Sequence, residues 1–91
     1  MNRKRERLEV IYDILKAIAD KNGKIKPTHI LYKSNLSHQM MSEYLRELID
    51  GKFVVELDSA SGKTYSLTEK GFAYLDKYKV IVDFVDSFGL Q

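Results

Sequence analysis

The stretch that decides the fold is PTHILYKSNLSHQMMSEYLRELIDG, residues 27–51, and it predicts two short helices joined by a tight turn. Pro27 suits the first position of a helix, because its ring fixes φ near the helical value. Asn35 tolerates the left-handed conformation that often ends a helix. Ser37 is a good N-cap for the second helix, and Gly51 is a good stop for it.

The two helices are expected over residues 27–34 and 38–50, with Leu36 dropping into the core between them. In the first helix Ile30 and Leu31 should face inward. In the second helix the apolar residues fall within about 100° of one another, which defines a buried face. That face consists of Met41, Tyr44, Leu45 and Leu48.

Upstream, the sequence predicts another helix over residues 3–21. Its apolar stripe recurs at spacings of 3, 4 and 3, as an amphipathic helix requires. The stripe consists of Leu8, Ile11, Leu15 and Ile18, widened by Tyr12 and Ile14. Asn22-Gly23 should stop this helix, and residues 24–26 should form a short extended piece, because a residue before proline avoids helical geometry.

Downstream, residues 53–57 and 63–67 are expected to form two strands of a β-hairpin around the turn formers at 58–62. Thr68 is expected to cap a long helix over residues 69–88, which Gly89 closes.

This order of elements is that of a winged helix-turn-helix, in which the hairpin is the wing. The fold class is therefore mainly α with a small β-hairpin (α+β), with an added C-terminal dimerisation helix. We expect a winged helix-turn-helix domain over residues 1–68 and a dimerisation helix over residues 69–91, together forming one structural unit.

The 91 residues correspond to one domain, and a chain this short buries only a small hydrophobic core when it folds. It contains no cysteine, which excludes disulfides and cysteine-bound zinc. The formal charge is only +2, but the first seven residues are basic and hold Arg3, Lys4, Arg5 and Arg7 against Glu6. A basic arm on a near-neutral body suits contact with a polyanion.

In this fold, helix 38–50 is the candidate recognition helix, because a helix fits the major groove of DNA and reads base edges there. Arginine pairs with guanine and glutamine with adenine through two hydrogen bonds. The candidate contacts on this helix and its cap are Ser37, His38, Gln39, Ser42 and Arg46. Phosphate contacts are expected chiefly from Lys33, Lys63, Arg3, Lys4 and Arg5.

Two other interpretations of this helix remain open. The outward face could simply be solvated, as on any amphipathic packing helix. Alternatively, the acidic residues Glu43, Glu47 and Asp50 would suit a protein–protein interaction module without direct DNA contact. An RNA-binding role is weaker, because the sequence shows no aromatic stacking platform.

The helix over residues 69–88 carries more apolar surface than one small domain can cover. Leu75, Tyr78, Val82 and Val85 are spaced 3, 4 and 3, which is a heptad seam. A neighbouring stripe repeats every seven residues, so we expect a homodimer, although the helix could instead fold back on the first helix of its own chain. The expected dimer interface is Leu75, Tyr78, Ile81, Val82, Val85 and Phe88.

Three segments resemble a family of small archaeal winged-helix proteins, of the Sulfolobus chromatin and transcription-regulator-like type. They are LEVIYDIL at 8–15, KPTHILYKSNLS at 26–37 and LTEKG at 67–71. The resemblance implies DNA binding, often of low sequence specificity, and a C-terminal helix that pairs antiparallel with its twin. It also implies that the DNA-facing residues are Ser37, His38, Gln39, Ser42 and Arg46. The near-neutral charge departs from a strongly basic chromatin protein and leaves a regulator equally possible.

Catalytic chemistry finds little support in the sequence. The two histidines, His29 and His38, have no nucleophile motif beside them, and no side chains are spaced as metal ligands. We expect no enzyme activity, no cofactor, no metal and no small-molecule ligand. No run of about 20 apolar residues would span a membrane, so we expect a cytoplasmic, nucleoid-associated protein.

Overall fold

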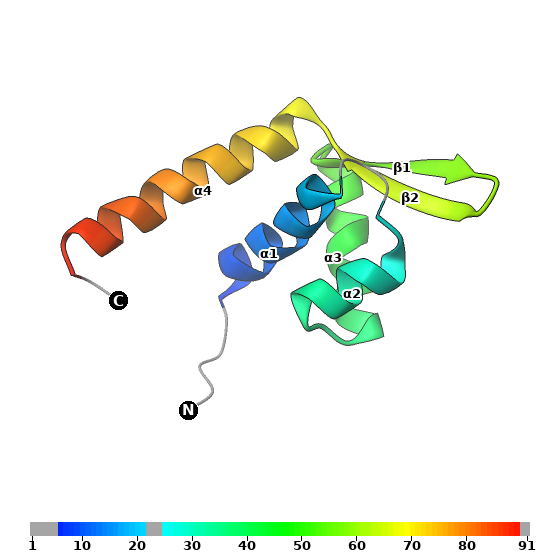
Figure 1. The fold of residues 1–91 in the computed structure, drawn as a ribbon, viewed down its shortest axis with the longest axis horizontal. Coiled ribbons are helices and arrows are strands. Elements are labelled where there is room, and N and C mark those ends of the chain that lie inside the picture. Colours follow the sequence, from blue (N-terminus) through cyan, green and yellow to red (C-terminus); the bar gives the residue numbers. More distant parts are fainter. Residues whose placement is uncertain (1–5, 22–24, 90–91) are drawn as a thin grey trace.

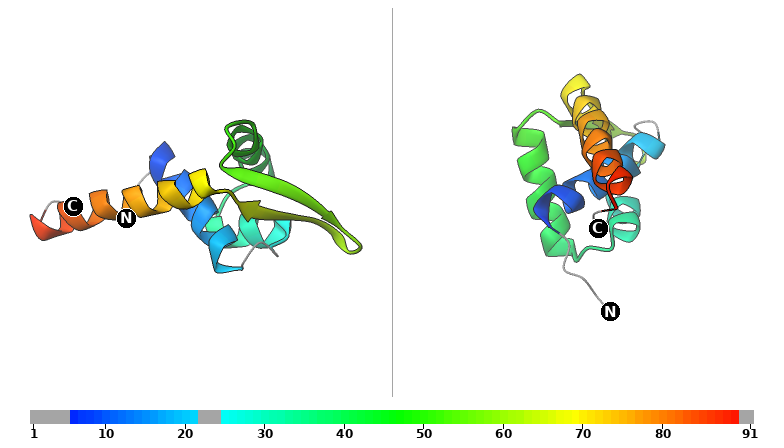
Figure 2. Two further views of the ribbon diagram at one scale, coloured as in Figure 1. Left: turned by 90° about the horizontal axis from the view of Figure 1, so that it is seen from above. Right: turned by 90° about the vertical axis from the view of Figure 1, so that its left-hand side faces the viewer.

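The structure is a computed structural model that describes residues 6–21 and 25–89. Its elements follow the predicted order (Figure 1): α1 (Arg7–Asp20), α2 (Pro27–Ser34), α3 (His38–Asp50), β1 (Val54–Ser59), β2 (Gly62–Leu67) and α4 (Glu69–Ser87). Three helices pack together, the hairpin projects from one end, and α4 leads away from the other (Figure 2). The predicted fold class, mainly α with a small β-hairpin and an added C-terminal helix, is confirmed, and dimerisation through that helix stays a prediction. The expected arm residues Arg3, Lys4 and Arg5 and the expected stop at Asn22-Gly23 lie outside the described residues.

The first helix begins later than predicted. Glu6 has an extended backbone, with φ −76° and ψ 158°, so α1 starts at Arg7 rather than at residue 3. Leu8 was expected in the buried stripe but is 53% exposed. The Tyr74 hydroxyl donates a hydrogen bond to the Leu8 carbonyl at 2.8 Å. Tyr74 thus bonds the backbone of Leu8, and the Leu8 side chain lies in solvent.

The helix-turn-helix matches the sequence prediction closely. Asn35 adopts the left-handed conformation, with φ 55° and ψ 50°, and Leu36 is buried. The Ser37 hydroxyl accepts a hydrogen bond from the Met40 amide at 3.2 Å, which satisfies one of the free N–H groups at the start of α3. These local contacts fix the angle between α2 and α3.

The hairpin is longer than predicted. Its antiparallel register runs from Val54 opposite Leu67 to Ser59 opposite Gly62, which leaves a two-residue connection. Gly62 has φ 121°, a conformation that favours glycine in a tight turn. On the other edge of β2, Ile25 forms a single bridge to Tyr65, as expected of the short extended piece before Pro27.

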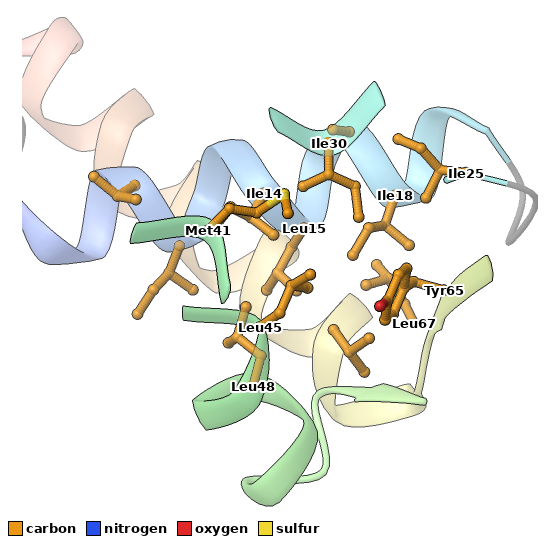
Figure 3. Close-up of a cluster of buried hydrophobic side chains, with 14 of the residues drawn as sticks. Ile14, Leu15, Ile18, Ile25, Ile30, Met41, Leu45, Leu48, Tyr65 and Leu67 are labelled. Atoms are coloured by element: carbon orange, nitrogen blue, oxygen red, sulfur yellow. The ribbon is translucent and has the colours of Figure 1, made fainter. Parts of the chain in front are cut away.

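One hydrophobic core joins these elements (Figure 3). Side chains from α1, α2, α3 and the hairpin point toward one another there, including Ile14, Leu15, Ile18, Ile30 and Leu45. The buried face of α3 consists of Met41, Leu45 and Leu48, with Tyr44 at its margin. The polar face of α3 is consequently turned away from the core.

The last helix is anchored at its start and free toward its end. The Thr68 hydroxyl accepts a hydrogen bond from the Gly71 amide at 3.2 Å and donates one to the Lys52 carbonyl at 2.5 Å. From there α4 runs back alongside α1, and its C-terminal half extends beyond the body (Figures 1 and 2). The helix ends at Ser87, one residue before the predicted end.

Candidate nucleic-acid interface

The outward face of α3 is open to solvent. All five residues predicted to face DNA from this helix and its cap are exposed: Ser37, His38, Gln39, Ser42 and Arg46. They stand opposite Met41, Leu45 and Leu48, whose burial fixes the rotation of the helix. The fold therefore presents a polar helix face that nothing in the described part of the protomer covers.

Two acidic side chains on α3 have polar partners. The Gln39 amide donates a hydrogen bond to the Glu43 carboxylate at 3.3 Å, one turn along the helix. Glu47 forms an ion pair with Arg7 of α1, and the hydrogen bond and charge of Glu47 raise the pKa of Arg7. The Arg7 guanidinium also lies 5.4 Å from the centre of the Tyr44 ring. The charge of Glu47 is thus compensated within the protomer.

A groove separates α3 from the wing. Its volume is about 570 Å³, and the charged and polar residues along it are Ser42, Arg46 and Asp50 from α3 with Glu56, Lys63 and Tyr65 from the hairpin. The structure therefore brings three of the predicted DNA-binding residues, Ser42, Arg46 and Lys63, to one groove. Of the other predicted residues, Ser37 and His38 lie at the start of α3, and Lys33 is exposed on α2.

The polar groups of the wing bond mainly to one another. The Lys63 ammonium contacts the Glu56 carboxylate at 3.2 Å, and the Tyr65 hydroxyl donates to the other Glu56 oxygen at 3.2 Å. Burial, reinforced by the charge and hydrogen bond of Glu56, raises the pKa of Tyr65, so its hydroxyl keeps the proton that it donates. At the tip, the Ser59 hydroxyl donates to the Gly62 carbonyl at 2.6 Å.

The other side of α3 faces the start of α1. Ser42, Arg46 and Asp50 point toward the wing, whereas Glu47 contacts Arg7. The basic segment of Arg3, Lys4 and Arg5 precedes this point in the chain, although these residues lie outside the described part. Arg7, the first residue of α1, therefore lies beside α3 on the flank opposite the wing.

Sequence reasoning missed the part that Tyr65 plays in this surface and the way its neighbours meet. Glu56, Tyr65 and Asp50 line one groove, and the Lys26 ammonium donates to the Ser61 carbonyl in the wing turn at 3.2 Å. The pairing of Glu56 with Tyr65 depends on the hairpin register. Had the sequence analysis assumed a two-residue turn between the strands, it would have predicted Glu56 and Tyr65 opposite each other on one face of the hairpin.

The predicted dimer interface divides into two parts. Leu75 and Tyr78 are half-buried against the protomer itself, and the Tyr78 ring stacks on Tyr12 of α1 with 4.7 Å between ring centres. Farther along α4, large apolar side chains are exposed: Val80, Ile81, Val82, Phe84 and Phe88. The first half of α4 thus folds back on α1, and the second half carries an apolar surface that residues 6–21 and 25–89 leave uncovered.

Among residues 6–21 and 25–89, the side chains form no cluster of three or more histidine or carboxylate groups that could hold a metal ion. None of the helices in these ranges has both the length and the apolar character needed to cross a membrane.

Comparisons with known proteins place the chain in a family. A family profile described as winged helix-turn-helix matches residues 4–85. An uncharacterized protein of the archaeon Methanocaldococcus jannaschii is 35% identical over 78 residues, which are 86% of this chain and 34% of that protein. The chain thus spans about a third of the length of this curated relative.

Several solved structures share the fold. Sso10a-2, a DNA-binding protein from Sulfolobus solfataricus, superposes with a TM-score of 0.79 at 20% identity and covers 92% of this chain and 85% of its own. A winged-helix DNA-binding protein from STIV gives a TM-score of 0.74 at 22% identity, over 87% of this chain and 91% of its own. MepR, a transcription regulator of the Staphylococcus aureus multidrug efflux pump MepA, gives a TM-score of 0.77 at 18% identity. The match covers 87% of this chain and 60% of the MepR chain.

The archaeal relative and the Sulfolobus structure confirm the resemblance found in the sequence. The family match also agrees with the prediction that the chain is not an enzyme. With a matching profile over residues 4–85 and the helix-turn-helix and wing in place, the chain belongs to the winged helix-turn-helix family.

Proposed function

We propose that the chain binds double-stranded DNA, as a transcriptional regulator or a nucleoid-associated protein, through α3 and the wing over residues 53–67. The observation that carries this proposal is the exposed polar face of α3, flanked by the wing on one side and by Arg7 at the start of α1 on the other. A helix presented in this way can enter the major groove while its neighbours contact phosphates. Solved structures with the same fold include proteins described as DNA-binding.

Within this proposal, the exposed side chains divide into two roles. Arg46 and Gln39 are exposed on α3 and would reach base edges. Phosphate contacts would come from Ser37, His38 and Ser42 on α3 and its cap, and from Lys33, Lys63 and the arm residues Arg3, Lys4 and Arg5.

We also propose that the protein acts as a homodimer through α4, with residues 1–68 as the DNA-binding domain and residues 69–91 as the dimerisation helix. The support is the apolar surface on the second half of α4, which a twin helix would cover. The charges along α4 favour antiparallel pairing. Lys77 and Lys79 near its middle would then lie close to the acidic Asp83 and Asp86 of the twin.

The proposal is tested by titrating DNA duplexes with the protein at two salt concentrations. Arg46→Ala should reduce the preference for one sequence over another. Replacing Arg3, Lys4 and Arg5 with glutamine should weaken binding to all sequences alike and lower the salt dependence by about 0.9 log units per lost phosphate contact. Lys16→Gln is the matched control, because Lys16 pairs with Asp20 on the exposed side of α1 and should not affect binding. Full binding by both variants would contradict the proposal.

The alternative is a protein-interaction module without DNA contact. The carboxylates on α3 favour it, since Glu43, Glu47 and Asp50 outnumber Arg46 on that helix. A wild-type protein that fails to bind any duplex at low salt would support this alternative.

A further inference from the structure

We infer that Glu56 is a positioning residue that holds the wing cation Lys63 away from phosphate and thereby limits the strength of DNA binding. This inference rests on the proposed function and concerns the groove between α3 and the wing.

The two oxygens of Glu56 are both engaged. One contacts the Lys63 ammonium at 3.2 Å, and the other accepts the Tyr65 hydroxyl at 3.2 Å. Tyr65 lies directly opposite Glu56 in the hairpin and is buried in the core, so it anchors the carboxylate. Glu56 is therefore held from two sides, unlike a surface acid that swings freely in solvent.

The groove is the place where a DNA strand would pass. When a recognition helix lies in the major groove and the wing reaches past the adjacent backbone, the strand between them must cross the space between helix and wing. Two cations, Arg46 and Lys63, line this space together with two carboxylates, Asp50 and Glu56. A phosphate entering it therefore meets a balanced set of charges instead of a basic channel.

The ion pair in the wing is half-exposed, which makes it weak enough for phosphate to compete. The ammonium has three N–H donors, but Glu56 neutralises its single positive charge, and the Glu56 carboxylate repels a phosphate that approaches Lys63. Each phosphate contact by Lys63 is then weaker than it would be without Glu56. The expected result is DNA binding that is looser, and less dependent on salt, than the number of basic residues alone would give.

The test is a double-mutant cycle measured by DNA titration over a series of salt concentrations. Glu56→Gln keeps an oxygen for the Tyr65 hydroxyl but removes the charge that holds Lys63. It should tighten binding about threefold to tenfold at low salt and steepen the salt dependence by about 0.9 for each protomer bound. In a Lys63→Gln background the same change should have almost no effect, since no cation is left to release.

Asp20→Asn is the matched control, because it also removes a carboxylate that pairs with a lysine, Lys16, but on α1 and outside the groove. It should tighten binding less than Glu56→Gln and leave the salt dependence unchanged. Thermal unfolding of each variant gives an independent measure of folding, and Glu56→Gln should unfold near the wild-type temperature.

Three outcomes would overturn the inference while leaving the proposed function intact. These are wild-type DNA binding that Glu56→Gln does not tighten, a gain that persists fully without Lys63, or an equal gain in Asp20→Asn. A wild-type protein that binds no DNA would instead overturn the proposed function, and this inference with it.

Discussion

At the end of α3 the left-handed backbone position is occupied by Lys52, with φ 69°, and not by the adjacent Gly51, whose φ is −82°. Sequence propensity favours the glycine for this position, so Gly51 was correctly predicted as the stop while the strained residue was not. The reason lies in tertiary contacts. The Gly51 and Lys52 carbonyls accept hydrogen bonds from Lys70 and Thr68, which fixes the path of the chain into β1.

Lys52→Gly should therefore stabilise the protein. A side chain in the left-handed region costs roughly 1–2 kcal/mol, and the greater freedom of glycine in the unfolded chain offsets about half of this. We expect the free energy of unfolding to rise by about 0.5–1 kcal/mol, measured by urea denaturation. Lys52→Ala is the control, because alanine keeps the strain and loses the charge. An equal gain in both variants would show that the charge, rather than the backbone, is responsible.

At the level of elements, the parts that depend on local signals were predictable. The Asn35 turn follows from the tolerance of asparagine for the left-handed conformation. The Ser37 and Thr68 caps follow from side chains that bond to their own neighbouring backbone. The hairpin register was not, because residues 58–62 contain several turn formers and allow more than one loop length. A shift of one residue would turn Glu56 away from Tyr65, so the α3–wing groove became visible only in the structure.

Gly71 shows how one element constrains another. It lies in the first turn of α4, where helix propensity alone predicts that Gly71→Ala would stabilise by about 1 kcal/mol. A Cβ atom there would instead press on the Phe53 carbonyl oxygen, which accepts a hydrogen bond from the Thr68 amide at 3.1 Å. Since backbone cannot move aside as a flexible side chain can, we expect a loss of about 1–3 kcal/mol.

Urea denaturation shows whether Gly71→Ala raises or lowers the free energy of unfolding. Ala73→Gly, at an exposed position of the same helix, is the control. Ala73→Gly should cost about 1 kcal/mol, as propensity predicts. A stabilised Gly71→Ala variant would show that α4 can shift away from the hairpin.

On the scale of the whole molecule, α4 is the element whose surroundings the sequence predicted only in part. Its heptad pattern runs without a break through Leu75, Tyr78, Val82 and Val85. Pattern alone cannot show where α1 stops covering it. In the structure the stack of Tyr12 on Tyr78 marks the end of the region packed within the protomer, and the exposed surface begins beyond it.

The proposed homodimer predicts a clear difference between two apolar positions on α4 that are equally exposed in the protomer. Ile81 is 56% exposed on the second half, and Phe72 is 51% exposed on the first turn. A charge at position 81 would be buried unpaired between twin helices, so Ile81→Glu should yield monomers, whereas Phe72→Glu should remain a dimer. Light scattering at several protein concentrations gives the mass of each. Because neither side chain belongs to the core, both variants should stay folded by circular dichroism.

If both variants have the same mass as the wild type, whether that is a monomer or a dimer, the second half of α4 is not the dimer interface. If the wild type is a dimer and Ile81→Glu is a monomer, this variant should also bind DNA more weakly. Two recognition helices in one dimer bind with a high effective concentration, because the first contact holds the second helix near the DNA.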